Sequence, residues 1–563
     1  MRPASGSPPL SRLLPRIAAA VCLAFALAAC PSSDGPGPKG NGTGGTPEPT
    51  RGGELVVAYP NEPPTLNPFV TGGDSAATRD LVRPLMPALY RLGPDGTREP
   101  WLLTAEPEGA DVGGTPFSVR VRLREDAVWS DGRLITADDL RFTWQAAIKS
   151  PKIASRDGYD RLADVVVEAP KTARLVFREP FARWRDLFSA GLGVLPAHAL
   201  GKTDISGALI RSWPVSGGPF VFKSRTAGLD LVLERNPRAW GDVPLLDRIR
   251  IVYVPDPVTA LQLYARGEVD VLGPYPAIEF ARRAAAARRG SSVTGDRGAT
   301  WVGVILNVKT PELSDVRVRR AIALALDREA IAEGLVREQG ALWDAPSAGD
   351  AARINAAFAR FRQDTVEAAR LLDAAGWSEP SSGGGTRRKG GRELSVTLAA
   401  ADAGELDQRI LRALNTQASG IGVDLNLVSM DYARLTGDWA PGPRFEAGLF
   451  VLRDAPGGGL RARFGIGGPE NVSRLSDKAL AGLLDAADRT LDDASTAVDA
   501  PSTRIADLVP VIPLYQLEVT LAARAGVREV EANASADGFL WNAAEWWIEG
   551  AGTPPGSPSP TAT

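Results

Sequence analysis

Leu-Arg-Glu-Asp-Ala-Val-Trp-Ser-Asp-Gly-Arg-Leu-Ile-Thr-Ala-Asp-Asp, residues 123–139, predicts the end of a strand, a turn and the start of a helix. Apolar and polar side chains alternate through Phe117–Arg124, as they do in a strand with one buried face. The arginines of this strand lie on its solvated face, so we do not interpret them as a nucleic-acid patch. Asp131-Gly132 is typical of a turn. Thr136 and Asp139 have the spacing of a capping box, with Asp in place of the usual Glu, and predict a helix start.

Strand and helix patterns alternate along the rest of the chain. Asp256-Pro257 begins a helix as N-cap and first helical residue, and Gly267 ends it. Another helix ends at Gly376, and we expect Val366, Ala369 and Leu372 to share its apolar face. Further strands are predicted at 229–234, 249–254, 269–272, 394–399 and 423–428, and a further helix at 328–336. This order favours an α/β fold with mixed sheets.

The chain is too long for one hydrophobic core. It has 563 residues, whereas single cores stop growing near about 250–300 residues, so we expect two or three packed units. Hydrophobic residues make up 44% and charged residues 23%, which is ordinary for a globular protein. The formal net charge of -3 provides no basic surface, so we expect no nucleic-acid partner.

Residues 1–29 have the pattern of a secretory signal peptide. Basic residues precede an apolar run at 17–29, which is shorter than the roughly 20 residues of a membrane-spanning helix. The run ends in Leu-Ala-Ala-Cys at Cys30, which is similar to the cleavage box of bacterial lipoproteins. We therefore expect lipidation of Cys30, and ordinary cleavage near Ala29 is the alternative. Cys22, the only other cysteine, leaves with the signal, so no disulfide is expected.

Two segments have the composition of disordered chain. Residues 30–52 are rich in Pro, Gly, Ser and Thr, and we interpret them as a tether that holds a folded protein at the outer face of the cell membrane. The tail at 550–563 has the same composition, and we predict that it is disordered as well.

The sequence offers little for catalysis or metal binding. His198 is the only histidine, so any catalytic triad must use it, and no Gly-x-Ser-x-Gly motif is present. Gly201-Lys202-Thr203 resembles the end of a phosphate loop, but Pro196 stands where that motif needs glycine. With one histidine and no free thiol, the usual ligands of zinc or copper are missing, while a calcium site of oxygen ligands stays possible. We expect a binding protein without a cofactor, and not an enzyme.

Several motifs, in order, resemble one family. They include Gly52–Ala58, Glu62–Pro68, the stretch at 123–139, Gly217–Phe220, Glu234–Pro237, Asp315–Ala321 and Ile512–Tyr515. The chain is identified by them as a member of the extracytoplasmic solute-binding proteins of ABC transporters, family 5, the type that includes oligopeptide- and dipeptide-binding lipoproteins. The resemblance runs from about residue 52 to residue 550.

The resemblance implies a two-lobed periplasmic-binding-protein fold of the large three-domain class. Lobe one is expected at 53–305, with an extra subdomain at about 91–207, and again at 510–549; lobe two is expected at 306–509. The lobes close on a ligand by a hinge motion, and the closed form docks on ABC permease subunits for transmembrane transport. A monomer is expected.

The resemblance also implies the ligand site. Peptide binders of this family hold the ligand backbone as a strand, and an acidic residue of lobe two pairs with its ammonium group. Alignment of residues 445–454 puts Asp454 at that position, next to Arg453; a turn residue is the alternative for Asp454. Glu62 matches a cleft-facing acidic position, or is a surface carboxylate of a loop. The candidate pocket walls, each of which could instead belong to the core, are Val451, Trp301 and Trp541.

Some features depart from the family pattern. The family often has an aromatic residue near Val451 and Asp-Pro after the acidic residue, whereas this chain has Ala-Pro-Gly-Gly-Gly at 455–459. The segments at 337–365 and 494–504 are short. The alternatives are therefore another solute, such as an oligosaccharide, an opine or a nickel chelate, or a degenerate homologue that acts as a sensor. A hydrolase is the least favoured, because the nucleophile motif is missing.

Overall fold

The computed structural model describes residues 48–552 except for 74, 95, 190–191, 276–277, 299, 337–339, 347–355, 380–383, 402–404, 431–433, 436–441, 443–444, 455–458 and 492–496. The predicted signal peptide, Cys30, the tether up to residue 47 and the tail from residue 553 lie outside the described residues. No helix in the described ranges combines the length and the apolar character needed to cross a bilayer.

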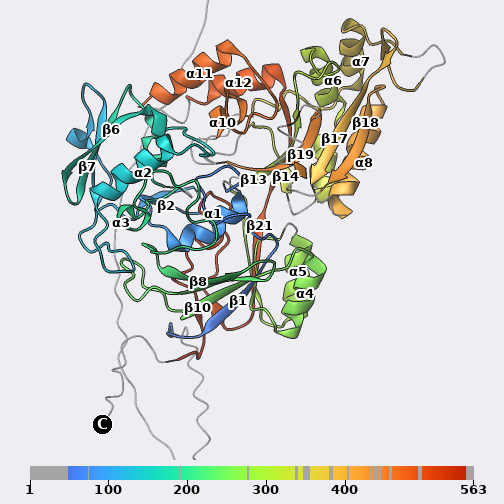
Figure 1. Ribbon diagram of the computed structural model, residues 1–563. Coiled ribbons are helices and arrows are strands. Elements are labelled where there is room, and N and C mark those ends of the chain that lie inside the picture. Colours follow the sequence, from blue (N-terminus) through green and yellow to red (C-terminus); the bar gives the residue numbers. More distant parts are fainter. Residues whose placement is uncertain are drawn as a thin grey trace, which may run out of the picture. The chain divides into compact units, whose positions relative to one another are not determined.

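The first sheet has seven strands. Their order is β12 (Ser292–Asp296), β21 (Val519–Ala523), β11 (Val271–Leu272), β1 (Glu54–Tyr59), β10 (Arg248–Tyr253), β9 (Asp230–Arg235) and β8 (Phe220–Thr226). β1 pairs in parallel with β10 and β11, whereas the other pairs are antiparallel, so the sheet is mixed. Helices α4 (Pro257–Arg266) and α5 (Ile278–Ala287) lie beside this sheet (Figure 1). The core on its other side includes α1 (Ala76–Val82) and η1 (Arg83–Leu85).

The second sheet has six strands. Their order is β14 (Gly340–Leu342), β20 (Val511–Leu517), β13 (Thr300–Leu306), β19 (Ala447–Arg453), β17 (Ser395–Ala401) and β18 (Asp424–Met430). β13 is antiparallel to β19 and β20, and β17 is parallel to β18 and β19. The core of this part also draws on α6 (Val316–Ala325), η5 (Ala330–Val336), α7 (Thr365–Ala374), α8 (Glu405–Ser419), α10 (Leu460–Phe464), α11 (Lys478–Arg489) and α12 (Asp499–Leu508).

A third, four-stranded sheet lies within the predicted extra subdomain. Its order is β4 (Val112–Gly113), β5 (Ser118–Arg122), β7 (Thr172–Phe177) and β6 (Leu162–Ala169), and α2 (Ala137–Lys149) packs against β6. The predicted helix start is confirmed, because the Asp139 carboxylate accepts a hydrogen bond from the backbone N–H of Thr136 at 2.9 Å. The same carboxylate accepts one from the buried indole of Trp129 at 3.2 Å. The mixed α/β architecture expected from the sequence is confirmed by the three sheets together.

Short elements complete the described chain. They are β2 (Tyr90–Leu92), β3 (Arg98–Pro100), η2 (Gly109–Asp111), η3 (Tyr159–Arg161), η4 (Ala182–Asp186), α3 (Ala197–Leu200), β15 (Arg388–Lys389), β16 (Arg392–Glu393), β22 (Val527–Arg528) and β23 (Trp547–Ile548). His198 lies in α3, where its Nε2 atom is 2.7 Å from an oxygen of Asp131 in the turn before α2. His198 therefore packs against this turn.

The chain passes twice between the first and the second sheet. β13 and β20 belong to the second sheet, whereas lobe one is predicted from the sequence to extend to residue 305 and to resume at residue 510. The chain crosses between the sheets near 297–300 and again between β20 and β21, near residue 518. The side-chain amide of Gln516 joins the two crossings, because it donates to the carbonyls of Arg297 and Gly298 at 2.7 Å each. The order of motifs in the sequence does not show to which of the two sheets a strand next to a crossing belongs.

Two smaller predictions are wrong in part. The predicted tether ends earlier than residue 52, because Thr50 donates to the carbonyl of Ile548 at 2.6 Å and the N–H of Gly52 donates to that of Leu245 at 2.9 Å. In α7, Val366 is 81% exposed, and the buried residues are Ala368 and Leu372. Asp364 caps this helix and Val366 lies in its first turn, where nothing covers it among the described residues.

Candidate functional site

The carboxyl-terminal half of β19 has a backbone edge with no strand partner among the described residues. β17 pairs only with Ala447, Gly448 and Leu449 of β19, whereas β13 pairs with β19 along its whole length. In an antiparallel pair, residues alternate between hydrogen bonding to the residue opposite and pointing their polar groups to the other side. The phase of the alternation therefore decides which groups of β19 face that edge.

One hydrogen bond sets the phase. The backbone N–H of Asn307 donates to the carbonyl of Glu446 at 2.8 Å, one step beyond the Leu306–Ala447 pair in the same register. The alternation then makes Val302–Val451 and Thr300–Arg453 pairs without mutual hydrogen bonds. The backbone N–H and C=O groups of Val451 and Arg453 thus point away from β13. Val451 itself is 64% exposed.

Asp454 follows β19 directly and is part of a buried ion pair. Its carboxylate accepts hydrogen bonds from Nε1 of Trp301 at 3.1 Å and from a guanidinium nitrogen of Arg463 at 2.5 Å. The side chains of Arg463 and Asp454 are 3% and 0% exposed. Burial lowers the pKa of Arg463, but the charges of Asp454 and Glu470 outweigh it, so the net shift of the pKa is upward. Asp454 therefore already has a cationic partner within its own part of the chain.

Glu62 also has an internal partner. It lies in the loop that follows β1, and its carboxylate accepts from a guanidinium nitrogen of Arg225 at 2.8 Å and from the backbone N–H of Gly228 at 2.8 Å. Its side chain is 30% exposed. Glu62 therefore fixes its loop to the β8–β9 turn.

Trp541 lies between β22 and β23, in the segment that returns to the first sheet. The guanidinium of Arg91 lies 5.6 Å from the centre of its ring, which is a cation–π distance. Its indole Nε1 atom is buried and has no hydrogen-bond partner among the described residues. The structure thus places Trp301 and Asp454 in contact at the end of β19. Glu62 and Trp541 lie instead in segments that pack with the first sheet.

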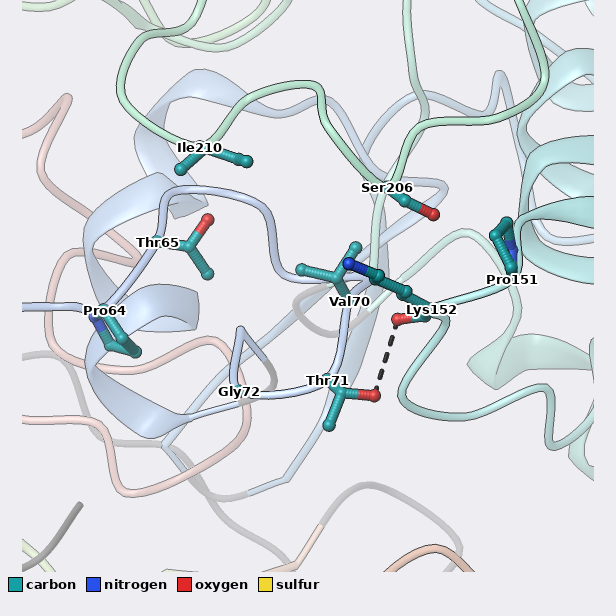
Figure 2. Close-up of a pocket in the computed structure, with 9 residues that line it drawn as sticks. All are labelled: Pro64, Thr65, Val70, Thr71, Gly72, Pro151, Lys152, Ser206 and Ile210. Atoms are coloured by element: carbon teal, nitrogen blue, oxygen red, sulfur yellow. Dashed lines mark hydrogen bonds between the residues drawn. The ribbon is translucent and has the colours of Figure 1, made fainter. Parts of the chain in front are cut away.

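A cavity that the sequence did not predict opens next to the Glu62 loop. It has a volume of about 470 Å³ and lies between the loop after β1, the turn after α2 and the segment near residue 206 (Figure 2). Its lining residues are Pro64, Thr65, Val70, Thr71, Gly72, Pro151, Lys152, Ser206 and Ile210. None of the predicted site residues lines it. Three hydroxyl groups and one ammonium group give it hydrogen-bonding capacity, but no acid and base pair.

These sites offer hydrogen-bonding groups of side chains and of the backbone. Among the described residues, no group of three or more His, Cys, Asp and Glu side chains could hold a metal ion. The candidate carboxylates are paired with arginines, and the free backbone edge of β19 offers donors and acceptors. Sequence reasoning missed Arg463 and Arg225, which lie 9 and 163 residues from their carboxylates, because no local pattern indicates either pairing. Only tertiary contacts bring each of them to its partner.

Comparison with known proteins identifies the family. The model of the bacterial extracellular solute-binding proteins, family 5, matches residues 99–450, and the chain belongs to this family. Members of this family are binding proteins of transport systems and not enzymes.

Relatives and solved structures support the same assignment. Oligopeptide-binding protein OppA of Mycobacterium tuberculosis is 28% identical over 510 residues, which cover 86% of this chain and 83% of OppA. The structure of AppA from Bacillus subtilis in complex with a nonapeptide matches with a TM-score of 0.77 at 21% identity, covering 89% of this chain and 100% of AppA. NikZ from Campylobacter jejuni in complex with Ni(L-His) matches with a TM-score of 0.76 at 20% identity, covering 88% of this chain and 99% of NikZ. The structural likenesses show a shared fold.

Proposed function

We propose that this protein captures peptides for an ABC importer and holds the peptide backbone against the edge of β19 at Val451 and Arg453. The observation that carries the proposal is the direction of the N–H and C=O groups of these two residues, away from β13. An extended peptide would satisfy these groups by adding as a strand, which gives affinity without reading side chains. Val451 is 64% exposed, so its side chain could contact a ligand bound there.

The predicted site residues take their roles around this edge. The peptide's ammonium group would approach Asp454 once ligand binding uncovers its carboxylate, which is 0% exposed in this structure. Glu62 and Trp541 would contribute walls of the cleft, and Trp301, which is 0% exposed, would contribute to a wall only after the same rearrangement. A hydrogen bond to a charged group is worth roughly 1.5–3 kcal/mol. We expect the Asp454 contact at the low end of this range, because Arg463 already neutralises that carboxylate.

Closure and delivery complete the proposal. The two crossings, at Arg297-Gly298 and near residue 518, would act as the hinge, and the closed form would be recognised by a membrane permease. Lipidation of Cys30 would hold the protein at the outer face of the membrane. The peptide names of OppA and of the AppA complex favour a peptide, and the Ni(L-His) complex of NikZ is the reason to test for other solutes.

One pair of variants tests the edge. Val451→Pro removes one N–H that points away from β13 and leaves the ladder to β13 intact, as proline is tolerated on free edges. Val451→Ala keeps that N–H and serves as the matched control. We expect Val451→Pro to weaken binding of a peptide library about tenfold or more, and Val451→Ala to change it less than about threefold. Titration calorimetry measures both, with the melting temperature of each empty variant as a folding check.

Native mass spectrometry of the purified protein tests the solute class. Released peptides support the proposal, and a sugar or a metal chelate overturns the peptide assignment while keeping the importer role. Equal peptide affinity for Val451→Pro and wild type contradicts the edge. A wild-type protein that binds no member of the peptide library contradicts peptide capture itself.

A further inference from the structure

Ion pairs join the extra subdomain, at about residues 91–207, to helices that contribute to the core of the second sheet. Arg183 of η4 donates to Asp488 of α11 at 2.9 Å, and Arg161 of η3 donates to Asp485 of α11 at 3.3 Å. Arg489, the last residue of α11, donates in the opposite direction, to Glu179 at 2.7 Å. η4 packs against α11, and Figure 1 shows α10 and α11 beside the segment that contains β6. Each part therefore supplies both arginines and carboxylates to the contact.

Each half of this interface also pairs its own charges. On the subdomain side, Arg161 donates to Glu179 at 2.6 Å and Arg183 to Asp157 at 3.0 Å. On the other side, a single nitrogen of Arg461 lies 2.8 Å from both Asp485 and Asp488. On separation of the halves, every one of these side chains except Arg489 would keep at least one of the named partners, and the Arg489 side chain is 49% exposed. The contact can open without leaving a buried charge uncompensated, which is the usual penalty for breaking a buried pair.

The burial of the network is intermediate. Asp488 is 9% exposed, and Arg161 and Arg183 are each 19% exposed. Such pairs are screened by salt more than fully buried ones and contribute little one by one. Several ion pairs that share partners act together. The network is therefore sensitive to ionic strength and to loss of its central pair, Arg183 and Asp488.

We propose that these eight side chains form an ionic clasp that holds the extra subdomain against α11, that this contact belongs to the closed arrangement, and that the clasp thereby sets the fraction of molecules that are closed. The clasp consists of Arg161, Arg183, Arg461 and Arg489 with Asp157, Glu179, Asp485 and Asp488. It rests on the proposed function, in that closure is the capture step. Apparent affinity equals intrinsic affinity scaled by the competent fraction, so the clasp tunes capture without touching the solute.

Hydrogen exchange of the full chain without added solute tests the clasp. Arg183→Gln with Asp488→Asn neutralises both partners of the central pair at once. We expect backbone exchange in 157–162 and 478–489 to become about tenfold faster or more in this double variant. Raising NaCl from about 50 mM to about 500 mM is expected to speed exchange there in the wild type and to have little further effect in the variant. Small-angle scattering is expected to show a larger radius of gyration for the variant.

Arg504→Gln is the matched control, because Arg504 pairs with Asp477 at the start of α11 at 2.7 Å without reaching the subdomain. It is expected to leave exchange in 157–162 unchanged. Wild-type exchange in the double variant, or equal acceleration by Arg504→Gln, overturns the clasp. If the double variant unfolds, Arg489→Gln, which removes only the Glu179 contact, replaces it, and wild-type exchange in 157–162 then overturns the clasp. The readout needs no solute, so failure of wild-type peptide binding would contradict the proposed function and leave this result standing.

Discussion

The Asp454–Arg463 pair and the clasp use the same chemistry in different surroundings. The first is a pair whose side chains are both at 3% exposure or less, and its Arg463 also contacts Glu470 at 3.3 Å, whereas the clasp residues Arg183 and Asp488 are 19% and 9% exposed and each have several partners. A buried pair is costly to break, because the charge that remains is shielded from water. A shared and partly exposed network exchanges partners at little expense. Burial therefore separates a permanent contact from one that can open, although both are arginine–carboxylate pairs.

Asp454→Ala is expected to have the largest effect. It leaves the guanidinium of Arg463 buried beside Trp301, with Glu470 as its remaining acidic contact at 3.3 Å. Loss of one partner of a buried pair lowers the free energy of unfolding by about 3–5 kcal/mol. Urea unfolding measures this change. Arg370→Gln, which removes an exposed pair with Glu367 on α7, is the control and should change the unfolding free energy by less than about 1 kcal/mol. Equal changes in the two variants would contradict the contrast.

The second-largest effect is expected in the pH dependence of the unfolding free energy. Asp186 of η4 lies beside the clasp, 2.6 Å from Arg98 and 3.9 Å from Arg183. Burial raises its pKa, the two arginines oppose this rise, and Asp157 and Asp488 add to it, for a net pKa of about 6. Because the folded pKa exceeds the unfolded one, the folded state holds more protons between about pH 4 and pH 6. The contribution of Asp186 to the unfolding free energy is therefore present below this window and lost as pH rises through it.

Asp186→Asn tests that sign, because the amide resembles the protonated acid. The unfolding free energy of the wild type minus that of the variant should fall as pH rises from about 4 to about 7. Unfolding curves across this range measure it. A difference that rises instead would mean that the arginines dominate and that the pKa of Asp186 is lowered.

The smallest effect is expected for Arg489→Gln. This side chain is 49% exposed and meets Glu179 at the rim of the clasp. Exposed pairs contribute about 0–1 kcal/mol, so the unfolding free energy should change within that range. Exchange in 157–162 should still rise, because the variant removes one bridge between the two parts. A loss of global stability comparable to that of Asp454→Ala would remove the distinction between the two kinds of pair.

Much of the local structure follows from neighbouring residues. The helix starts at Thr136 and Asp256 were predicted correctly, because a cap depends on residues two or three positions apart. The left-handed Gly267 that ends α4 was predicted for the same reason, with φ at 79°. The family assignment rested on motifs of this local kind, and it is confirmed.

The candidate site was only partly accessible to such reasoning. The sequence singled out Trp301 and Asp454, and the structure joins them by a hydrogen bond at 3.1 Å. It did not point to Arg463, although this residue decides the charge that Asp454 presents. The proposed roles of Asp454, Glu62, Arg453, Val451, Trp541 and Trp301 in ligand binding remain predictions for the binding experiments.

Composition and short-range patterns were enough to predict the class of protein and its mixed α/β elements. Which sheet β13 and β20 join, which groups of β19 have no strand partner among the described residues, and which arginine neutralises each carboxylate became known only from the folded chain. Those outcomes depend on contacts between residues far apart in the chain, such as Arg183 with Asp488 and Glu62 with Arg225. Such contacts form only when distant segments of the chain fold against one another, so the pattern of neighbouring residues cannot predict them.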